Sequence, residues 1–144
     1  MRAYTYRLSL SARHDSADLS SLPSLLGLTA RRLWKAGDER IAPNGRVIGG
    51  IWRYSACSMD LSEQSGQSLP ERLAVVVEQL KPHKAVFEEW AASGAAFRVF
   101  IGWFFDSNSG DCFGWELLRD ISDLKIDLDF DVYGPDSNPP VDAP

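Results

Sequence analysis

The stretch from Phe97 to Phe105 constrains the fold more than any other part of this 144-residue chain. Every second residue of this stretch is apolar, and this period of two, which places them all on one face, is typical of a β-strand. The opposite face carries two further aromatic residues, Phe100 and Phe104. A strand that is apolar on both sides is typical of the interior of a sheet that is covered twice. We therefore expect a central strand with other elements packed on each of its faces.

A helix is predicted ahead of this strand. Ser68-Leu69-Pro70-Glu71 matches a capping box, in which the Ser68 and Glu71 side chains each satisfy an unpaired backbone N–H. Pro82 should interrupt the helix, because its ring removes a backbone hydrogen bond and clashes with the preceding turn. We expect a second helical segment to begin there and to end near Ser93-Gly94. The apolar stripe of the two segments consists of Leu69, Leu73, Val76, Leu80, Phe87 and Trp90.

The remaining elements follow from weaker patterns of the same kind. They are a strand over 4–10, a short helix within 15–27, strands over 31–41 and 46–59 joined at Asn44-Gly45, a short strand over 112–114, a helix over 116–124 and a last strand over 126–132. The predicted order is β-α-β-β-α-β-β-α-β. Hairpins mixed with helices favour an α+β fold with a mainly antiparallel sheet and helices packed on it. We expect one domain over residues 1–133 and a Pro-rich flexible tail over 134–144.

The charge distribution narrows the range of partners. The chain has a net charge of −5, with nine basic and five acidic residues in 1–60 and six basic and fifteen acidic residues in 61–144. Because an acidic protein repels phosphate backbones, we expect no nucleic-acid partner. No stretch approaches the roughly 18 apolar residues of a membrane span, and the first residues lack the apolar run of a signal peptide. We expect a cytoplasmic protein with no membrane partner.

Residues that typically carry catalysis or bind metals are few. No Gly-rich phosphate loop, His-Glu-x-x-His motif or Gly-x-Ser-x-Gly elbow occurs. The histidines and cysteines, which are His14, His83, Cys57 and Cys112, show no pair at the short spacing of a structural zinc site. In a reducing compartment two buried free thiols are the simplest interpretation of the cysteines. We therefore expect no catalytic residue, no metal and no cofactor.

Three aspartates in the last predicted strand form one candidate binding surface. At a spacing of two, Asp127, Asp129 and Asp131 share a strand face, about 6.6 Å apart in succession. They are interpreted as a solvated strand face, as a strip that binds a Lys/Arg-rich protein, or, if Asp106 or Asp111 lies close, as a cation site. We take the three as the predicted protein-binding residues.

The segment from Trp34 to Asp38 is a second candidate. Gly37 has no side chain, so a ligand could approach the backbone there, and Trp52 could add aromatic surface from the paired strand. The predicted ligand-binding residues are Trp34, Lys35, Gly37, Asp38 and Trp52. The basic and aromatic residues of 31–35 also occur in nucleic-acid sites, but the acidic chain favours a solvated strand instead.

Several of these landmarks together are similar to a known family. They are Leu26-Gly27-Leu28, Trp34-Lys35-Ala36-Gly37-Asp38, Trp52, the capped helix with Leu80 and Pro82, and the closing Leu128-Asp129-Phe130-Asp131-Val132-Tyr133. Over about residues 3–133 the chain resembles the bacterial domain of unknown function 4279 family. The resemblance implies a small α+β domain without an established enzyme activity. Some relatives resemble immunity proteins, which neutralise a toxin.

We therefore expect a non-enzymatic binding protein. Its most specific version is a toxin-neutralising immunity-type protein that blocks a basic partner through an acidic surface. The alternative is a small-molecule-binding or sensor domain with a pocket near Trp34, Gly37 and Trp52. A homo-oligomer is compatible with either hypothesis.

Overall fold

The computed structural model describes residues 3–61 and 66–136. Within them, a five-stranded sheet has the order β2-β5-β1-β6-β7, and β3 and β4 form a separate two-stranded sheet. The strands are β1 Tyr4–His14, β2 Ala30–Trp34, β3 Glu39–Ile41, β4 Val47–Ile51, β5 Ser55–Asp60, β6 Ala96–Phe105 and β7 Ile126–Tyr133. The helices are α1 Leu22–Leu26, α2 Leu69–Leu80, the 3-10 turn η1 Lys81–His83, α3 Lys84–Ala92 and α4 Trp115–Asp123.

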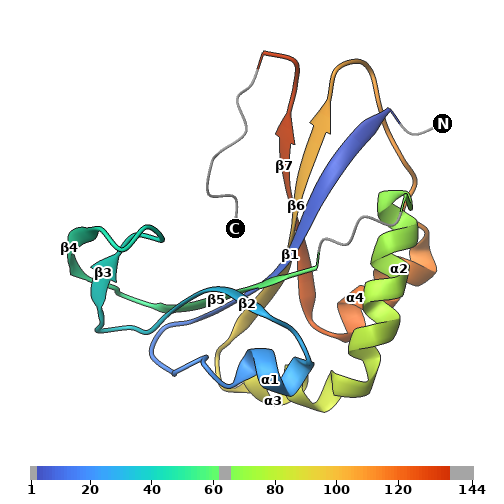
Figure 1. Cartoon of the computed structure of the whole chain (residues 1–144). Helices are drawn as coiled ribbons and strands as arrows, with labels where there is room; N and C mark the ends of the chain where they lie inside the picture. The colour runs from blue at the N-terminus through green and yellow to red at the C-terminus, as the bar shows by residue number, and fades with distance from the viewer. Residues whose placement is uncertain (1–2, 62–65, 137–144) are drawn as a thin grey trace.

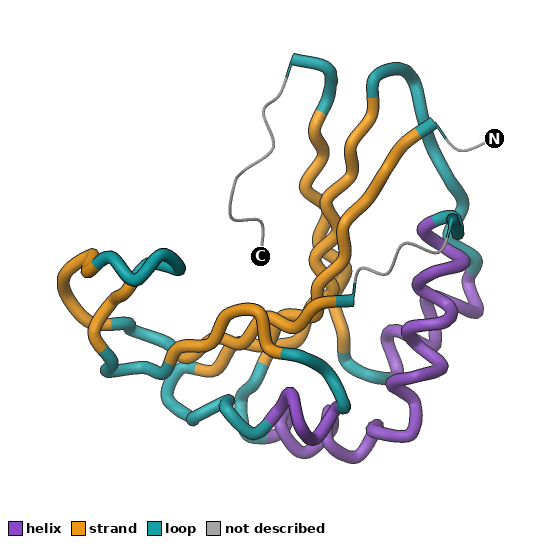
Figure 2. The backbone as a smooth tube through the Cα atoms, viewed as in Figure 1, coloured by secondary structure: helices purple, strands orange, loops and turns teal. Residues whose placement is uncertain are grey.

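The pairing within the large sheet is antiparallel except at one edge, where β6 and β7 are parallel. Figure 1 shows the described helices together on one side of this sheet, and Figure 2 shows how strongly the sheet bends along its strands. The predicted α+β class, with a mainly antiparallel sheet and helices packed on it, is confirmed. We call the side without described helices the open face.

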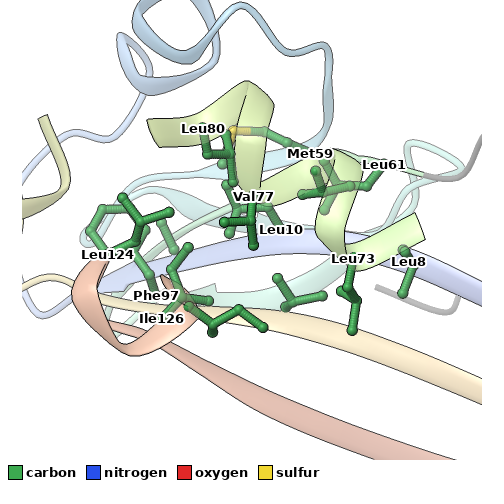
Figure 3. Close-up of a cluster of buried hydrophobic side chains, with 14 of the residues drawn as sticks. Leu8, Leu10, Met59, Leu61, Leu73, Val77, Leu80, Phe97, Leu124 and Ile126 are labelled. Carbon is green, nitrogen blue, oxygen red and sulfur yellow. The ribbon is translucent and has the colours of Figure 1, made fainter. Parts of the chain in front are cut away.

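The core lies between the sheet and the helices. Leu10, Met59 and Phe97 of the strands and Leu73, Val77 and Leu80 of α2 belong to one buried cluster, which Figure 3 shows in close-up. Burying each such side chain contributes about 1.5–3 kcal/mol. Leu80, a member of the predicted apolar stripe, is buried, and so is Trp103 of β6.

The break at Pro82 and the Ser68 half of the capping box occur as predicted, whereas the Glu71 carboxylate accepts from the Ser68 hydroxyl at 2.8 Å. The Ser68 side chain accepts a hydrogen bond from the Glu71 N–H, and α2 then continues to Leu80. Pro82 lies in the 3-10 turn that separates α2 from α3. In the first helix, Gly27 follows Leu26 with a positive φ of 67°, a conformation that ends helices with little strain in glycine.

The predicted hairpin of two long strands is instead divided into four strands. β2 pairs with β5 and β3 pairs with β4, around the Asn44-Gly45 turn. Gly49 and Gly50 both have positive φ, which turns the chain away from a straight continuation into β5. The β3–β4 hairpin therefore extends away from the large sheet (Figure 1).

The short strand predicted over residues 112–114 is wrong. Side-chain hydrogen bonds hold this loop, because Trp103 Nε1 donates to Ser109 Oγ at 3.2 Å and the Cys112 N–H donates to Asp111 Oδ1 at 2.9 Å. α4 follows and returns the chain, so that β7 pairs parallel to β6. A parallel pair requires such a crossover connection, so no antiparallel return strand forms.

The expectation that β6 is covered on both faces is also wrong for the described part of the chain, since the open face carries no helix there. Phe100 is nevertheless buried, although it lies outside the main core cluster. Phe104 stacks on Tyr133 with ring centroids 4.9 Å apart. On this face Phe104 is thus covered by a neighbour on the sheet instead of by a helix.

Two expectations remain, a Pro-rich tail and the lack of a membrane span. Most of the predicted tail, residues 137–144, lies outside the described residues. Among those that are described, no helix has both the length and the apolar character needed to cross a membrane.

Candidate functional site

Strand register places chemically distinctive side chains in two rows across the open face. Directly paired residues point to the same side of a sheet, so each row can be followed from strand to strand. The first row runs through Trp34, Ala56, Arg13 and Ala96, and the second runs through Arg32, Ser58, Ser11, Arg98 and Asp127. In both rows short side chains lie between long ones.

This alternation of short and long side chains produces a hollow. The two rows and Tyr54 line a cavity of about 250 Å³, which we call the open-face pocket. Its floor includes Ser11, Ala56, Ser58 and Ala96, whose short side chains leave space above the strands. The pocket therefore follows from the pairing of all five strands of the large sheet.

An aromatic cluster forms one wall. Trp34 stacks on Trp52 with centroids 4.1 Å apart and planes 13° apart, and Tyr54 meets the Trp34 ring edge-on at 5.8 Å. The Arg32 guanidinium lies 4.9 Å from the Trp34 ring centroid, and that of Arg13 lies 3.8 Å from the centroid of Tyr54. Each such cation–π contact contributes about 0.5–1 kcal/mol at an exposed site, so the rings help to hold both cations in place.

Two residues that line this pocket carry a buried polar atom without a hydrogen-bond partner among the described residues. The atoms are the hydroxyl of Ser58, a residue that is 7% exposed, and the indole nitrogen of Trp34. Leaving a buried polar group unsatisfied costs about 1–3 kcal/mol. These two unsatisfied groups therefore lower the stability of the folded protein, and both belong to residues that line the cavity.

The charges around the pocket are unequally compensated. Arg98 donates to Asp129 at 2.7 Å, across the β6–β7 pair. Neither Arg13 nor Arg32 forms an ion pair within the part of the chain that the structure describes. The pocket therefore carries positive charge on a protein that is acidic as a whole.

The predicted ligand residues divide into two groups. Trp34 lines the pocket and Trp52 stacks behind it, whereas Lys35, Gly37 and Asp38 are exposed outside the lining. The Gly37 N–H donates to the Trp52 carbonyl at 2.8 Å, and the Trp52 N–H donates to the Asp38 carbonyl at 2.9 Å. With its φ of 92°, Gly37 forms the turn that brings Trp52 against Trp34.

The predicted protein-binding residues lie on the same open face, along the edge strand β7. Asp127 lines the open-face pocket, and Asp129 pairs with Arg98. Asp131 accepts a hydrogen bond from the Tyr133 hydroxyl, and this bond raises the pKa of Tyr133. The two candidate surfaces are therefore neighbours, since Trp34 and Asp127 border one cavity.

The cation-site interpretation gains no support from this arrangement. Asp111 accepts a hydrogen bond from the Tyr4 hydroxyl at 2.6 Å, on the core side of β1. Among the described residues, no group of three or more His, Cys, Asp or Glu side chains could hold a metal ion.

His14 and Cys57 have structural environments. The Nδ1 atom of His14 accepts from the N–H groups of Ser16 and Ala17, so Nε2 carries the proton and donates to the Ser93 carbonyl at 2.9 Å. Burial raises the pKa of the Cys57 thiol to about 11, which disfavours the nucleophilic thiolate at neutral pH.

The predicted site lacks most residues of the pocket, among them Arg13, Arg32, Tyr54, Ser58 and Arg98. A weak signal exists for two of them. Arg13 lies on the polar face of the alternating first strand, and Arg98 interrupts an otherwise apolar strand. Their proximity depends on long-range strand pairing, which local patterns do not reveal.

The comparisons with known proteins give one match. A family model described as a domain of unknown function, DUF4279, matches residues 3–135. The searches of curated proteins and of solved structures find no match.

Proposed function

Because the chain belongs to the DUF4279 family, which is defined without a known activity, we propose a function from its own geometry. The protein is a non-enzymatic binding protein that holds a small molecule in the open-face pocket. The proposal keeps Trp34 and Trp52 from the sequence-based hypothesis and replaces the backbone approach at Gly37 with the cavity beside Trp34.

One observation carries this proposal. Two residues that line the pocket, Ser58 and Trp34, each carry a buried polar atom without a partner among the described residues, the hydroxyl and the Nε1. Buried polar groups in folded proteins are nearly always hydrogen-bonded, so a group left without a partner calls for a specific explanation. A bound ligand that satisfies both groups is such an explanation. Pockets for drug-sized ligands measure roughly 300–1,000 Å³, so this one suits a smaller molecule.

The environments of His14 and Cys57 support binding over catalysis. Both ring nitrogens of His14 are engaged with backbone groups, and the Cys57 thiol has a raised pKa. A cytoplasmic location is part of the proposal, and the two free cysteines support it because a reducing compartment keeps thiols unpaired.

The test is a screen of small metabolites by thermal shift and tryptophan fluorescence. Ala56→Leu places a larger side chain on the pocket floor, whereas Ala85→Leu makes the same change at an exposed position of α3. We expect compounds that stabilise the wild type and Ala85→Leu but not Ala56→Leu. If every stabilising compound acts equally on all three proteins, the pocket is not the binding site.

A second candidate function is the immunity-type protein that blocks a basic toxin. The observation that favours it is the row of Asp127, Asp129 and Asp131 along the outer strand of the sheet. Charges at the rim of an interface mainly accelerate association, and salt screens this effect over about 8 Å at physiological ionic strength.

Affinity capture with mass spectrometry would identify a basic partner, and association rates at two ionic strengths would test the strip. Asp129→Lys should slow association and weaken its salt dependence. Asp123→Lys on α4 is the matched charge reversal outside the strip. Equal rates for the two variants would show that the strip is only a solvated strand face.

A further inference from the structure

We propose, on the premise of the small-molecule function above, that the ligand of the open-face pocket is a small organic anion. Its carboxylate or phosphate oxygens accept hydrogen bonds from Ser58, from Trp34 and from two guanidinium groups. These guanidinium groups belong to Arg13 and Arg32, which stand in adjacent rows of the lining.

The hydrogen-bonding character of the lining selects an acceptor. An indole nitrogen and a guanidinium can only donate, and a serine hydroxyl can donate as well as accept. The Trp34 Nε1 and the Ser58 hydroxyl have no partner among the described residues. A ligand that supplies only donors would leave the indole unsatisfied, whereas an oxyanion satisfies every one of these groups.

The charge of the lining selects an anion among acceptors. Three arginines and one aspartate border the cavity, and one of these arginines, Arg98, is already bound to Asp129. Arg13 and Arg32 lack an ion-pair partner within the described chain, and each lies over an aromatic ring. A guanidinium that stacks on a ring keeps in-plane N–H groups, whose fork geometry matches a carboxylate or a phosphate.

The rest of the lining favours an organic ion over a bare one. Trp34 and Tyr54 present aromatic carbon, and the floor adds the methyl groups of Ala56 and Ala96. Small-molecule sites typically combine such apolar surface with a few converging polar groups. The anionic group therefore lies toward the arginines while a compact carbon frame lies on the alanine floor.

Three probes of the same shape test the charge requirement. Benzoate, benzamide and benzamidine share a phenyl ring and are respectively anionic, neutral and cationic. Phenyl phosphate is a fourth probe, which carries a phosphate in place of the carboxylate. Calorimetry and tryptophan fluorescence should show binding of benzoate or phenyl phosphate, with benzamide at least about tenfold weaker and benzamidine without measurable binding. The better of the two oxyanions distinguishes a carboxylate ligand from a phosphate ligand.

Paired arginine variants test the site. Arg32→Gln removes a guanidinium of the lining, and Arg31→Gln makes the same change at the preceding residue, which does not border this pocket. We expect about a tenfold loss of affinity for the bound anion with Arg32→Gln and no change with Arg31→Gln.

Ser58→Ala distinguishes a ligand-binding serine from a purely structural one, because the two roles predict different changes in thermal midpoint and in anion affinity. Since the hydroxyl is unsatisfied, its removal should leave the thermal midpoint of the unliganded protein unchanged or raise it. The same variant should weaken anion binding. A lower midpoint with unchanged affinity would assign Ser58 to the fold and overturn its role in the site.

Other outcomes would also overturn the inference. They are equal affinity for benzoate and benzamide, equal effects of Arg31→Gln and Arg32→Gln, or no binding of any anionic probe up to about 10 mM. A neutral or cationic metabolite that binds the wild type but not Ala56→Leu would overturn the proposal that the ligand is an anion, while the small-molecule function would stand. If no compound of any charge binds, the small-molecule function fails as well.

Discussion

Cys57 and Ser58 are neighbours in β5 whose side chains point to opposite faces of the sheet. Cys57 pairs across from Ala12 and Leu33 on the core side, whereas Ser58 pairs across from Ser11 and Arg32 on the open face. The thiol is stable among apolar groups as a neutral species, and the hydroxyl is left without a partner among the described residues. A single step along the strand thus separates a core residue from a residue that lines the open-face pocket.

The two cysteines should differ in reactivity. Cys57 is buried with a pKa of about 11, so both access and thiolate formation are suppressed, whereas Cys112 is exposed. We expect one thiol per native chain to react rapidly with a thiol reagent at neutral pH, as counted by mass spectrometry. Cys112→Ser should abolish the rapid reaction, and two rapid thiols in the wild type would contradict the burial of Cys57.

At the scale of elements, an ion-pair cluster connects the end of α2 with α4. The Lys81 Nζ lies 2.6 Å from Glu78 Oε1 and 3.2 Å from Asp120 Oδ2, and Arg119 also bonds Asp120 at 3.0 Å. Hydrogen bonds from Arg119 and then Lys81 hold the pKa of Asp120 below its ordinary value of 3.8. The cluster therefore favours the ionised carboxylate in the folded protein.

Stability should depend on this carboxylate in a defined pH range. A depressed folded pKa adds stability above the unfolded value near 3.8, and that stability is lost as the pH falls through the folded pKa. Asp120→Asn should lower the thermal midpoint slightly at pH 7 and not at about pH 2, because exposed pairs contribute little. An equal effect at both pH values would show that the carboxylate charge is irrelevant.

The elements with strong local signals could be predicted from the sequence. The Ser68 cap, the break at Pro82 and the alternation from Phe97 onward each depend on neighbours in the chain. The division of residues 31–59 into four strands coincides with the positive-φ glycines Gly37, Gly49 and Gly50. A sequence pattern does not distinguish such a break from a continuous hairpin.

The site was only partly predictable for a related reason. Trp34 and Trp52 are conspicuous as residue types, and both lie at the site. Arg13, Ser58 and Arg98 become neighbours only through the register of β1 with β5 and β6. Isolated polar residues in a strand are ordinarily solvated, so nothing in their local context indicates a shared cavity.

At the scale of the whole molecule, Trp103 connects the main strands to the core. Its ring stacks on Tyr4 with centroids 3.7 Å apart, and the Tyr4 hydroxyl in turn bonds Asp111 and accepts from the Leu69 N–H. Loss of the indole would leave a large cavity where β1, β6 and α2 meet.

Trp103→Ala should therefore lower the free energy of unfolding by about 3–5 kcal/mol. Urea titration followed by circular dichroism would measure the change. Trp115→Ala serves as the control because Trp115 is 69% exposed. Equal midpoints for the two variants would contradict the position of Trp103 in the core.

The first strand of the chain becomes the middle strand of the sheet, between β5 and β6. Arg13 pairs with Ala96 and Tyr4 with Phe105, so β1 cannot complete its ladder until the ribosome has released the chain through Phe105. Contacts between such distant segments form slowly, because closing long loops precedes any stabilising pairing. During synthesis β1 is an alternating apolar strand with an unpaired edge, which other chains can join. A nascent chain of this protein therefore exposes an unpaired strand edge for longer than one that pairs its strands in order.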